Sequence, residues 1–170
     1  MKDNEDYFDI GDINDDEESS RSSASAEESK RPSFADEFED ERKMWKDKVI
    51  EMANKVNKLN EVTTLQVDLY SSRQIIIERI AKLYKYLSAY NAMYKSNKKE
   101  LFVKYTVDSD IKLGQGEKII MVEGDLSGLQ EKINLIEQHI DYYKETVKNL
   151  DSMLYGVRNK LQIEQFLSGK

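Results

Sequence analysis

The sequence predicts a mainly all-α protein built from long helices. Charged residues make up 35% of the 170-residue chain and there is a single proline, a composition typical of long solvated helices rather than of a sheet protein. Apolar residues recur at alternating spacings of three and four along two long stretches. That period is the pattern of helices that pack along a heptad seam.

The N-terminal region, residues 1–36, is expected to be a disordered acidic tail, because it has too few apolar residues to build a core. Residues 1–42 contain 16 acidic and 5 basic residues, a net charge of −11, so the rest of the chain, with 17 acidic and 21 basic residues, carries +4. This asymmetry predicts an anionic partner for the body of the protein. The island Asp6–Ile10 is interpreted as part of a solvated tail; the alternative is a short motif that docks on a basic partner or on the protein's own basic face.

The next region, residues 37–104, is predicted to be helical. Its seam begins with Trp45, Val49 and Met52 and resumes from Leu69 to Tyr94. The phase of the repeat slips across Val62 and Leu65, and a break is expected near Asn60 or at Ser71-Ser72.

Residues 105–125 are predicted to form a connecting loop or a β-hairpin. Glycine and aspartate punctuate this segment, and Ile119–Val122 is a short apolar run that would pair as a strand with Leu101–Val107. Asp125 is expected to be the N-cap of the helix that follows.

The last region, residues 126–170, carries an unbroken heptad repeat from Leu126 to Leu161. An isolated helix drifts about 20° per heptad from such a repeat, so the pattern predicts supercoiling against another helix. The partner is either the first long helix of the same chain or another subunit; β-branched residues at both seam positions favour an oligomer larger than a dimer. The predicted oligomer interface consists of Ile133, Ile136, Ile140, Val147, Leu150, Leu154 and Leu161.

The sequence offers no catalytic constellation, so we expect a protein that is not an enzyme and needs no cofactor or metal. There is no cysteine, and His139, the only histidine, is expected at the surface or in an interface. Gly114-Gln115-Gly116 lacks the lysine of a phosphate loop and is interpreted as a turn. No apolar run approaches the roughly 20 residues that cross a bilayer.

A basic, aromatic-rich stretch runs from Arg73 to Lys104, with eight basic and two acidic residues. Cations beside aromatic rings suit single-stranded nucleic acid, because cations follow phosphates and rings stack on unpaired bases. The alternatives are lysines that merely solvate an outer face, or a contact with an acidic membrane or protein. The predicted phosphate ligands and stacking residues are Arg79, Lys82, Lys95, Lys98, Lys99, Lys104, Tyr86 and Tyr105; the row Arg79, Lys82 and Tyr86 shares one helix face.

Five short motifs follow one another in a recognisable order: Leu69–Ser72, Lys98–Tyr105, Ile119–Leu126, Ile140–Tyr142 and Phe166–Lys170. With them, residues 45–170 resemble the UvsY family of recombination mediator proteins of T-even-like phages.

This resemblance implies a non-catalytic protein of the cytoplasm of an infected bacterial cell. Such a protein binds single-stranded DNA covered by single-strand-binding protein, forms a ring-like homo-oligomer through its C-terminal helices, and helps a RecA-like recombinase to load. The alternative is a coiled-coil scaffold or structural interaction protein without a nucleic-acid role.

Overall fold

Four α-helices make up the part of the chain that the computed structural model describes, residues 33–56, 58, 61–107 and 114–169. They are α1 (Phe34–Lys55), α2 (Val62–Val107), α3 (Gln115–Asp125) and α4 (Ser127–Leu167). The prediction of an all-α protein with long helices is confirmed, and none of these residues is in a strand. The disorder predicted for the N-terminal tail concerns residues that lie outside the described part, except for the last few.

Hydrogen bonds at Ser33 set the start of α1. The backbone N–H of Asp36 donates to the Ser33 hydroxyl at 3.3 Å, and the Ser33 N–H donates to the Asp36 carboxylate at 3.2 Å. This reciprocal capping box satisfies two donors that a helix start otherwise leaves unpaired. The helix therefore begins at Phe34.

The break expected near Asn60 is confirmed by the gap between α1 and α2. The other expected position, Ser71-Ser72, lies inside α2, and the Ser72 side chain is buried. Counted from Val62, the buried positions of α2 keep spacings of three, four or seven. The slip in phase thus belongs to the connection between the two helices and not to either helix.

The β-hairpin predicted in residues 105–125 is wrong, because the described parts of both expected strands are helical. Leu101–Val107 is the last part of α2, and the apolar run Ile119–Val122 lies in α3, where Val122 alone of the run is buried. A short apolar run fits a strand and a helix equally well. Here the Glu117 carboxylate accepts from the Gly114 N–H at 2.8 Å and favours a helix start.

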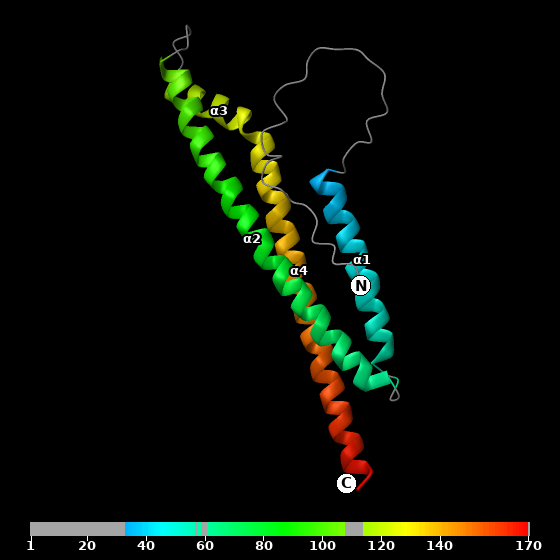
Figure 1. Cartoon of the computed structure of the whole chain (residues 1–170). Helices are drawn as coiled ribbons and strands as arrows, with labels where there is room; N and C mark the ends of the chain where they lie inside the picture. The colour runs from blue at the N-terminus through cyan, green and yellow to red at the C-terminus, as the bar shows by residue number, and fades with distance from the viewer. Residues whose placement is uncertain (1–32, 57, 59–60, 108–113, 170) are drawn as a thin grey trace, which may run out of the picture. The chain divides into compact units, whose positions relative to one another are not determined.

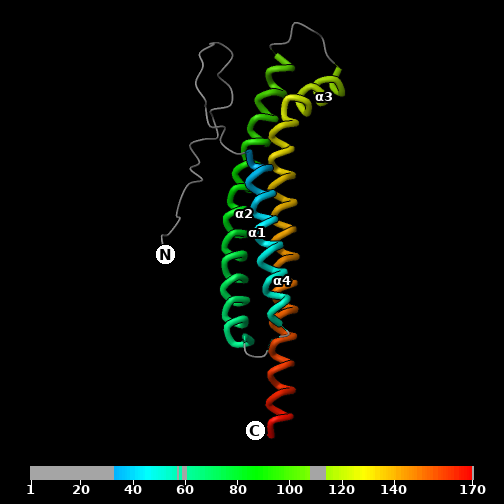
Figure 2. Tube along the Cα trace, turned by 90° about the vertical axis from the view of Figure 1, so that its right-hand side faces the viewer, coloured from blue at the N-terminus to red at the C-terminus, as the bar shows by residue number. Residues whose placement is uncertain are grey.

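Asp125 is not the N-cap of α4, as the sequence predicted, but the last residue of α3. The backbone stays helical through Leu126, whose N–H donates to the Val122 carbonyl at 3.1 Å. The Asp125 carboxylate instead accepts from the Tyr105 hydroxyl at 2.6 Å. Figures 1 and 2 show α3 turned away from the axis of α4 at this junction.

Contacts between side chains set the direction of the three long helices. Along α1, Phe34 meets Tyr90 and Glu41 meets Arg79, so α1 and α2 run antiparallel. Phe38 stacks on His139, whereas Lys160, near the far end of α4, donates to the Val56 carbonyl. The helices α1 and α4 therefore run parallel, and α2 lies antiparallel to both, as the two ribbon views show (Figures 1 and 2).

The core lies along the heptad seams of these three helices. Leu69, Ile76 and Leu150 have almost no exposed surface. Three large apolar side chains of α1 are buried, Phe38, Trp45 and Met52, each seven residues from the next, against six on α2 and seven on α4. Because each such burial contributes about 1.5–3 kcal/mol, α1 is held less firmly than α2 and α4 hold each other.

The C-terminal end of α4 extends beyond the last turn of α1 and the first turn of α2 (Figures 1 and 2). Lys160 still contacts Val56, but Ile163, Phe166 and Leu167 are 60%, 86% and 76% exposed. These three residues share one side of the helix by their spacing of three and four. They form an apolar surface that no described part of the chain covers.

Candidate functional site

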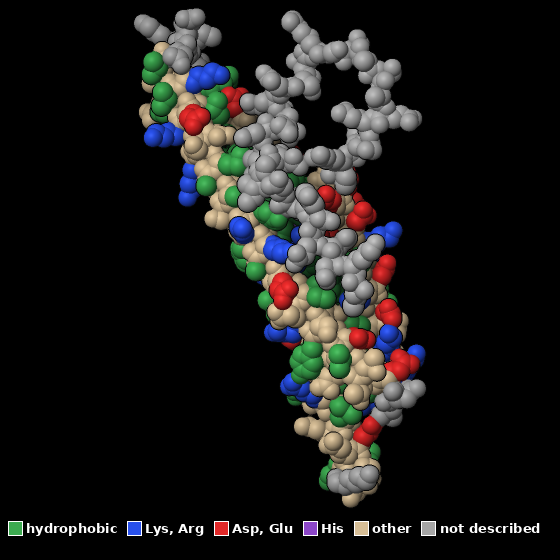
Figure 3. All heavy atoms as spheres, in the orientation of Figure 1, with side chains coloured by type: hydrophobic (Ala, Val, Ile, Leu, Met, Phe, Trp, Pro, Cys, Tyr) green, Lys and Arg blue, Asp and Glu red, His purple; other side chains and the backbone are tan. Residues whose placement is uncertain are grey.

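The second half of α2 carries an exposed group of three cations and one aromatic ring that we call the lysine face: Lys95, Lys98, Lys99 and Phe102. Their spacing of three, four and seven residues places them on one side of the helix. All four side chains are exposed, and Phe102 has 38% of its surface accessible. Figure 3 shows Lys and Arg side chains along this upper part of α2.

The lysine face keeps most of its positive charge. Lys95 and Lys99 form no ion pair with any residue in the described ranges. Lys98 lies 3.8 Å from the Glu123 carboxylate of α3 and 5.7 Å from the centre of the Tyr94 ring. The contact with Glu123 is between two exposed side chains, and such pairs contribute at most about 1 kcal/mol. A stronger anionic ligand can therefore displace it.

Lys104 is exposed but points to a different side of α2. It borders a shallow hollow of about 370 Å³ with Ser96, Lys99, Glu100 and Val103. The Glu100 carboxylate accepts from the Ser96 hydroxyl at 3.3 Å. Lys104 and Lys99 thus flank this hollow, which joins Lys104 to the edge of the lysine face.

Arg79, predicted as a phosphate ligand, is engaged by α1 in this structure. Its Nη2 donates to Glu41 Oε1 at 2.6 Å, and its Nε is buried without a hydrogen-bond partner. Lys82 is exposed on the flank of the same helix, whereas Tyr86 is half-buried against the core. The predicted row of Arg79, Lys82 and Tyr86 is therefore partly covered by α1.

The two predicted stacking residues both serve contacts within the chain. Tyr105 donates to Asp125, and Tyr86 packs against the core. Phe102 is the exposed ring that accompanies the lysines, and it was not chosen from the sequence. Phe102 follows Lys99, Lys98 and Lys95 by three, four and seven residues. This spacing is the signal that could have identified it.

A partly buried polar cluster joins α1, α2 and α4. Glu41 Oε2 accepts from His139 and from the Tyr143 hydroxyl, each at 2.7 Å, while its Oε1 accepts from Arg79. The Arg42 Nε donates to His139 Nδ1 at 3.4 Å, so the hydrogen of the imidazole resides on Nε2 and points at Glu41. His139 is fully buried between α1 and α4, so of the two expected locations, surface or interface, the surface is excluded.

The carboxylate of Glu41 is held ionised by its surroundings. Burial alone would raise its pKa, but the hydrogen bonds from His139 and Tyr143 and the charge of Arg79 outweigh burial and lower the pKa to about 2. Burial and the same hydrogen bond raise the pKa of Tyr143. The cluster is thus a charged contact between helices, with each oxygen of Glu41 satisfied.

The seven residues predicted to form the oligomer interface lie in or beside the core of the single chain. Ile133, Ile136, Ile140, Leu150 and Leu154 are buried, and Val147 and Leu161 are half-buried against the same core. The chain's own helices occupy the seam, so the fold-back that the sequence left open is the arrangement found. Their role between subunits stays a prediction, one that requires helices to be exchanged between chains.

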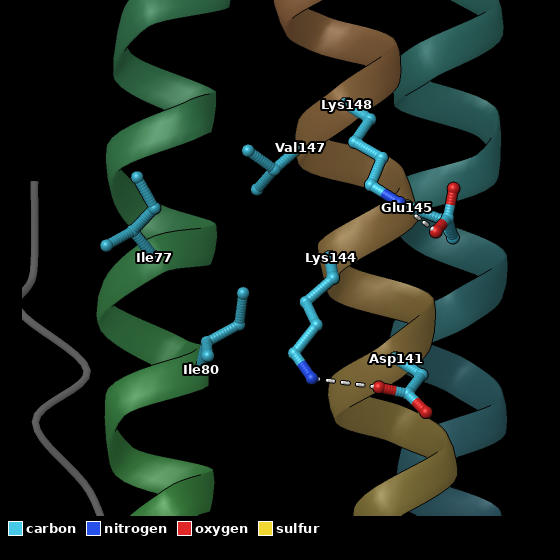
Figure 4. Close-up of a pocket in the computed structure, with 7 residues that line it drawn as sticks. All are labelled: Ile77, Ile80, Asp141, Lys144, Glu145, Val147 and Lys148. Atoms are coloured by element: carbon cyan, nitrogen blue, oxygen red, sulfur yellow. Dashed lines mark hydrogen bonds and ion pairs between the residues drawn. The ribbon is translucent and has the colours of Figure 1, made fainter.

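Val147 borders an open groove of about 630 Å³ between α2 and α4, together with Ile77 and Ile80 (Figure 4). Two lysines at its rim are paired along α4: Lys144 with Asp141 at 3.0 Å and Lys148 with Glu145 at 2.5 Å. The groove combines apolar walls with neutralised charges.

The described residues contain neither a candidate metal centre nor a membrane-spanning helix. They contain no group of three or more His, Cys, Asp or Glu side chains placed to hold a metal ion. Within the same ranges, no helix combines the length and the apolar character that spanning a bilayer demands.

Comparison with known proteins gives this chain no relative. No protein-family model matches it, and neither the curated proteins nor the solved structures include a match.

Proposed function

We propose that the protein is a non-catalytic binder of single-stranded DNA, with the lysine face as its primary contact. The observation that carries this proposal is the presence of Lys95 and Lys99, without an ion pair among the described residues, on one side of a helix with Lys98 and the exposed ring of Phe102. Cations that follow phosphates and a ring that stacks on a base are the two elements of binding without sequence preference.

The size of the lysine face limits the affinity of one chain. From Lys95 to Phe102 the helix rises roughly 10 Å, so one face reaches only a few phosphates. Three or four contacts predict a salt dependence with a log–log slope of about −2 to −3 for a single strand. Useful affinity then requires several copies on one strand, because linked sites raise the avidity by roughly 10²–10⁴.

A more specific role within DNA binding is that of a recombination mediator, which the motif resemblance implies. In this role a ring-like homo-oligomer holds DNA already covered by single-strand-binding protein and helps a RecA-like recombinase to load. The resemblance and the lysine face support this role. Its direct test is a recombinase-loading assay on covered DNA.

The DNA-binding proposal is tested with two matched double variants. Replacing Lys95 and Lys99 with Gln removes two cations that lack an ion pair in the described structure. Replacing Lys144 and Lys148 with Gln removes two that are already paired on α4. Both variants lose the same net charge, and Gln is a good helix former.

Fluorescence anisotropy of labelled oligo-dT, measured over a range of salt concentrations, distinguishes the outcomes. The first variant should bind about tenfold more weakly at low salt and with a slope smaller by about 1.4. The second should change the affinity by less than about twofold. Equal losses in the two variants would reduce the effect to net charge and remove the lysine face from the proposal.

A second candidate function, a protein-interaction scaffold, is favoured by one observation. The apolar surface of Ile163, Phe166 and Leu167 at the end of α4 is the kind of surface that binds another protein. Light scattering would then show an assembly that depends on these residues and is indifferent to oligo-dT.

A further inference from the structure

The cluster around Glu41 has the composition of an anion-binding site. Three donors converge on one carboxylate: Arg79 from α2, and His139 and Tyr143 from α4. The donors belong to α2 and α4, whereas the acceptor belongs to α1. The pair of helices α2 and α4 therefore presents a ready set of donors, and α1 supplies the anion.

The site offers more donors than Glu41 uses. Arg79 Nε is buried and has no hydrogen-bond partner, and a buried donor left unpaired is unusual and unfavourable. Glu41 Oε1 accepts from Arg79 Nη2 alone, so the pairing uses one arm of the guanidinium fork. A phosphate group has more acceptor oxygens and pairs with the fork of an arginine through two parallel bonds, so it would use the remaining donor.

Aromatic contacts beside the carboxylate resemble base stacking. The ring of Phe38 lies on His139 with 4.1 Å between centres and an angle of 9° between planes. One turn earlier, Phe34 meets the edge of Tyr90 at 6.1 Å. The rings between α1 and the other two helices are therefore held in the stacked or edge contacts that unpaired bases make with aromatic side chains.

The first two turns of α1 are strongly negative, as a nucleic-acid strand is. Its first eight residues contain no base and five carboxylates, Asp36, Glu37, Glu39, Asp40 and Glu41. Of these, Glu41 pairs with Arg79 of α2, a helix with eight basic and three acidic residues, whereas Asp36, Glu39 and Asp40 are exposed. Burial raises the pKa of Glu37, which Arg79 opposes. The contact is thus one of a polyanion with a cationic helix.

We infer that the first half of α1 is a built-in competitor of nucleic acid: its Glu41 and Phe38 occupy an anion and ring site made by Arg79, His139 and Tyr143. When α1 detaches, Arg79 becomes accessible on α2 beside Lys82 and Tyr86. By their spacing, these three residues share one face of the helix. This inference rests on the proposed binding of single-stranded DNA. It adds that α1 and DNA exclude each other on the pair of α2 and α4.

The helix can be pinned to test this exclusion, because the chain contains no cysteine. Ile50 of α1 and Asn149 of α4 line the same surface groove. The double variant Ile50→Cys with Asn149→Cys, joined by a bismaleimide reagent, fixes α1 in place; the same variant capped with a monofunctional maleimide is its control. Circular dichroism verifies that both forms are folded.

Binding of labelled oligo-dT then decides between the outcomes. We expect the pinned form to bind about tenfold more weakly than the control, because its competent state is no longer populated. Equal binding in both forms would overturn the inference and leave the lysine face as the whole site. Absence of binding in both forms would overturn the inference together with the proposed function.

Trp45 supplies a second readout that does not depend on crosslinking. It is the chain's one tryptophan, it lies on α1, and it is 4% exposed against Tyr143. Saturating oligo-dT should shift its emission to the red in the wild-type chain and leave the pinned form unchanged. An unshifted spectrum in a chain that binds oligo-dT would contradict the departure of α1.

Glu41→Gln, with Glu39→Gln as the control, tests the carboxylate itself. Glu39 is an exposed acid on the same turn. The Glu41 variant should bind oligo-dT about tenfold more tightly, because loss of the charged contact populates the open state. The Glu39 variant should stay within about twofold of the wild type. An unchanged affinity in Glu41→Gln would also overturn the inference.

Discussion

The two halves of α2 have similar side chains and different neighbours. Up to Tyr90 the helix lies beside both α1 and α4, and its arginines are neutralised: Arg73 pairs with Asp151 at 2.7 Å and Arg79 with Glu41 at 2.6 Å. Beyond Tyr90 the lysines lie on the outer surface, and Lys98 has only a distant contact with Glu123. A basic residue is thus available for a ligand only where no other helix covers it.

The largest expected effect separates the two halves by stability. Ile76→Ala removes a fully buried side chain in the first half and should lower the free energy of unfolding by about 3–4 kcal/mol. Leu101→Ala, at a half-buried position in the second half, should lower it by about 1 kcal/mol. Urea denaturation followed by circular dichroism measures both. Similar losses would mean that the second half is packed as firmly as the first.

Acid titration should break the contact between the first half and α1. The pKa of Glu41 in the folded chain, about 2, lies below its ordinary value of 4.5. The ionised carboxylate therefore stabilises the fold fully above about pH 4.5, and this contribution is lost as the pH falls towards 2. Because Glu41 is partly exposed, we expect about 2 kcal/mol rather than the full linkage value.

The measurement is the difference in unfolding free energy between the wild type and Glu41→Gln at pH 6, 4, 3 and 2. The difference should shrink steadily over the lower three values, because Gln cannot ionise. A difference that stays constant down to pH 2 would show that Glu41 has no special role in the stability of the folded chain.

The smallest expected effect on stability concerns the exposed ring of Phe102 in the second half of α2. Phe102→Ala should change the stability by less than about 0.5 kcal/mol, because the ring is exposed. It should weaken oligo-dT binding by about fivefold, the loss of one stacked base. Tyr155→Ala, at an exposed ring of α4 away from the lysines, is the control for a general loss of aromatic surface. The same loss in both variants would exclude specific stacking by Phe102.

The sequence predicted the seams well and their partners poorly. The heptad positions of α1, α2 and α4, such as Trp45, Ile76 and Ile140, are buried as the spacing indicated. A heptad repeat states that a helix has a partner, but the same repeat serves a helix of the same chain or of another. Hence the residues predicted for an oligomer interface proved to pack first within the chain.

The sequence predicted the site residues that need only to be exposed. It missed the residues whose surroundings are set by contacts between distant parts of the chain. Lys95, Lys98 and Lys99 are exposed, as a run of lysines on a helix usually is. Arg79 is 38 positions from Glu41, and His139 is 98 positions from it. No local pattern relates residues so far apart, so the polar cluster had no signal in the spacing. The run Ile119–Val122 was ambiguous because four apolar residues are too few to show a period.

The polar cluster also fixes the alignment of the helices along their length. Seams that repeat every seven residues still match when one helix slides by one heptad, which displaces it by roughly 10 Å. Such a slide would keep apolar side chains on apolar side chains, but it would carry Glu41 away from Arg79 and His139 and leave the partly buried Arg79 without its counterion. The apolar layers would pack equally well in either register, but only one register pairs Glu41 with Arg79 and His139. The polar cluster therefore selects that register, which is the use for which buried polar groups are best known.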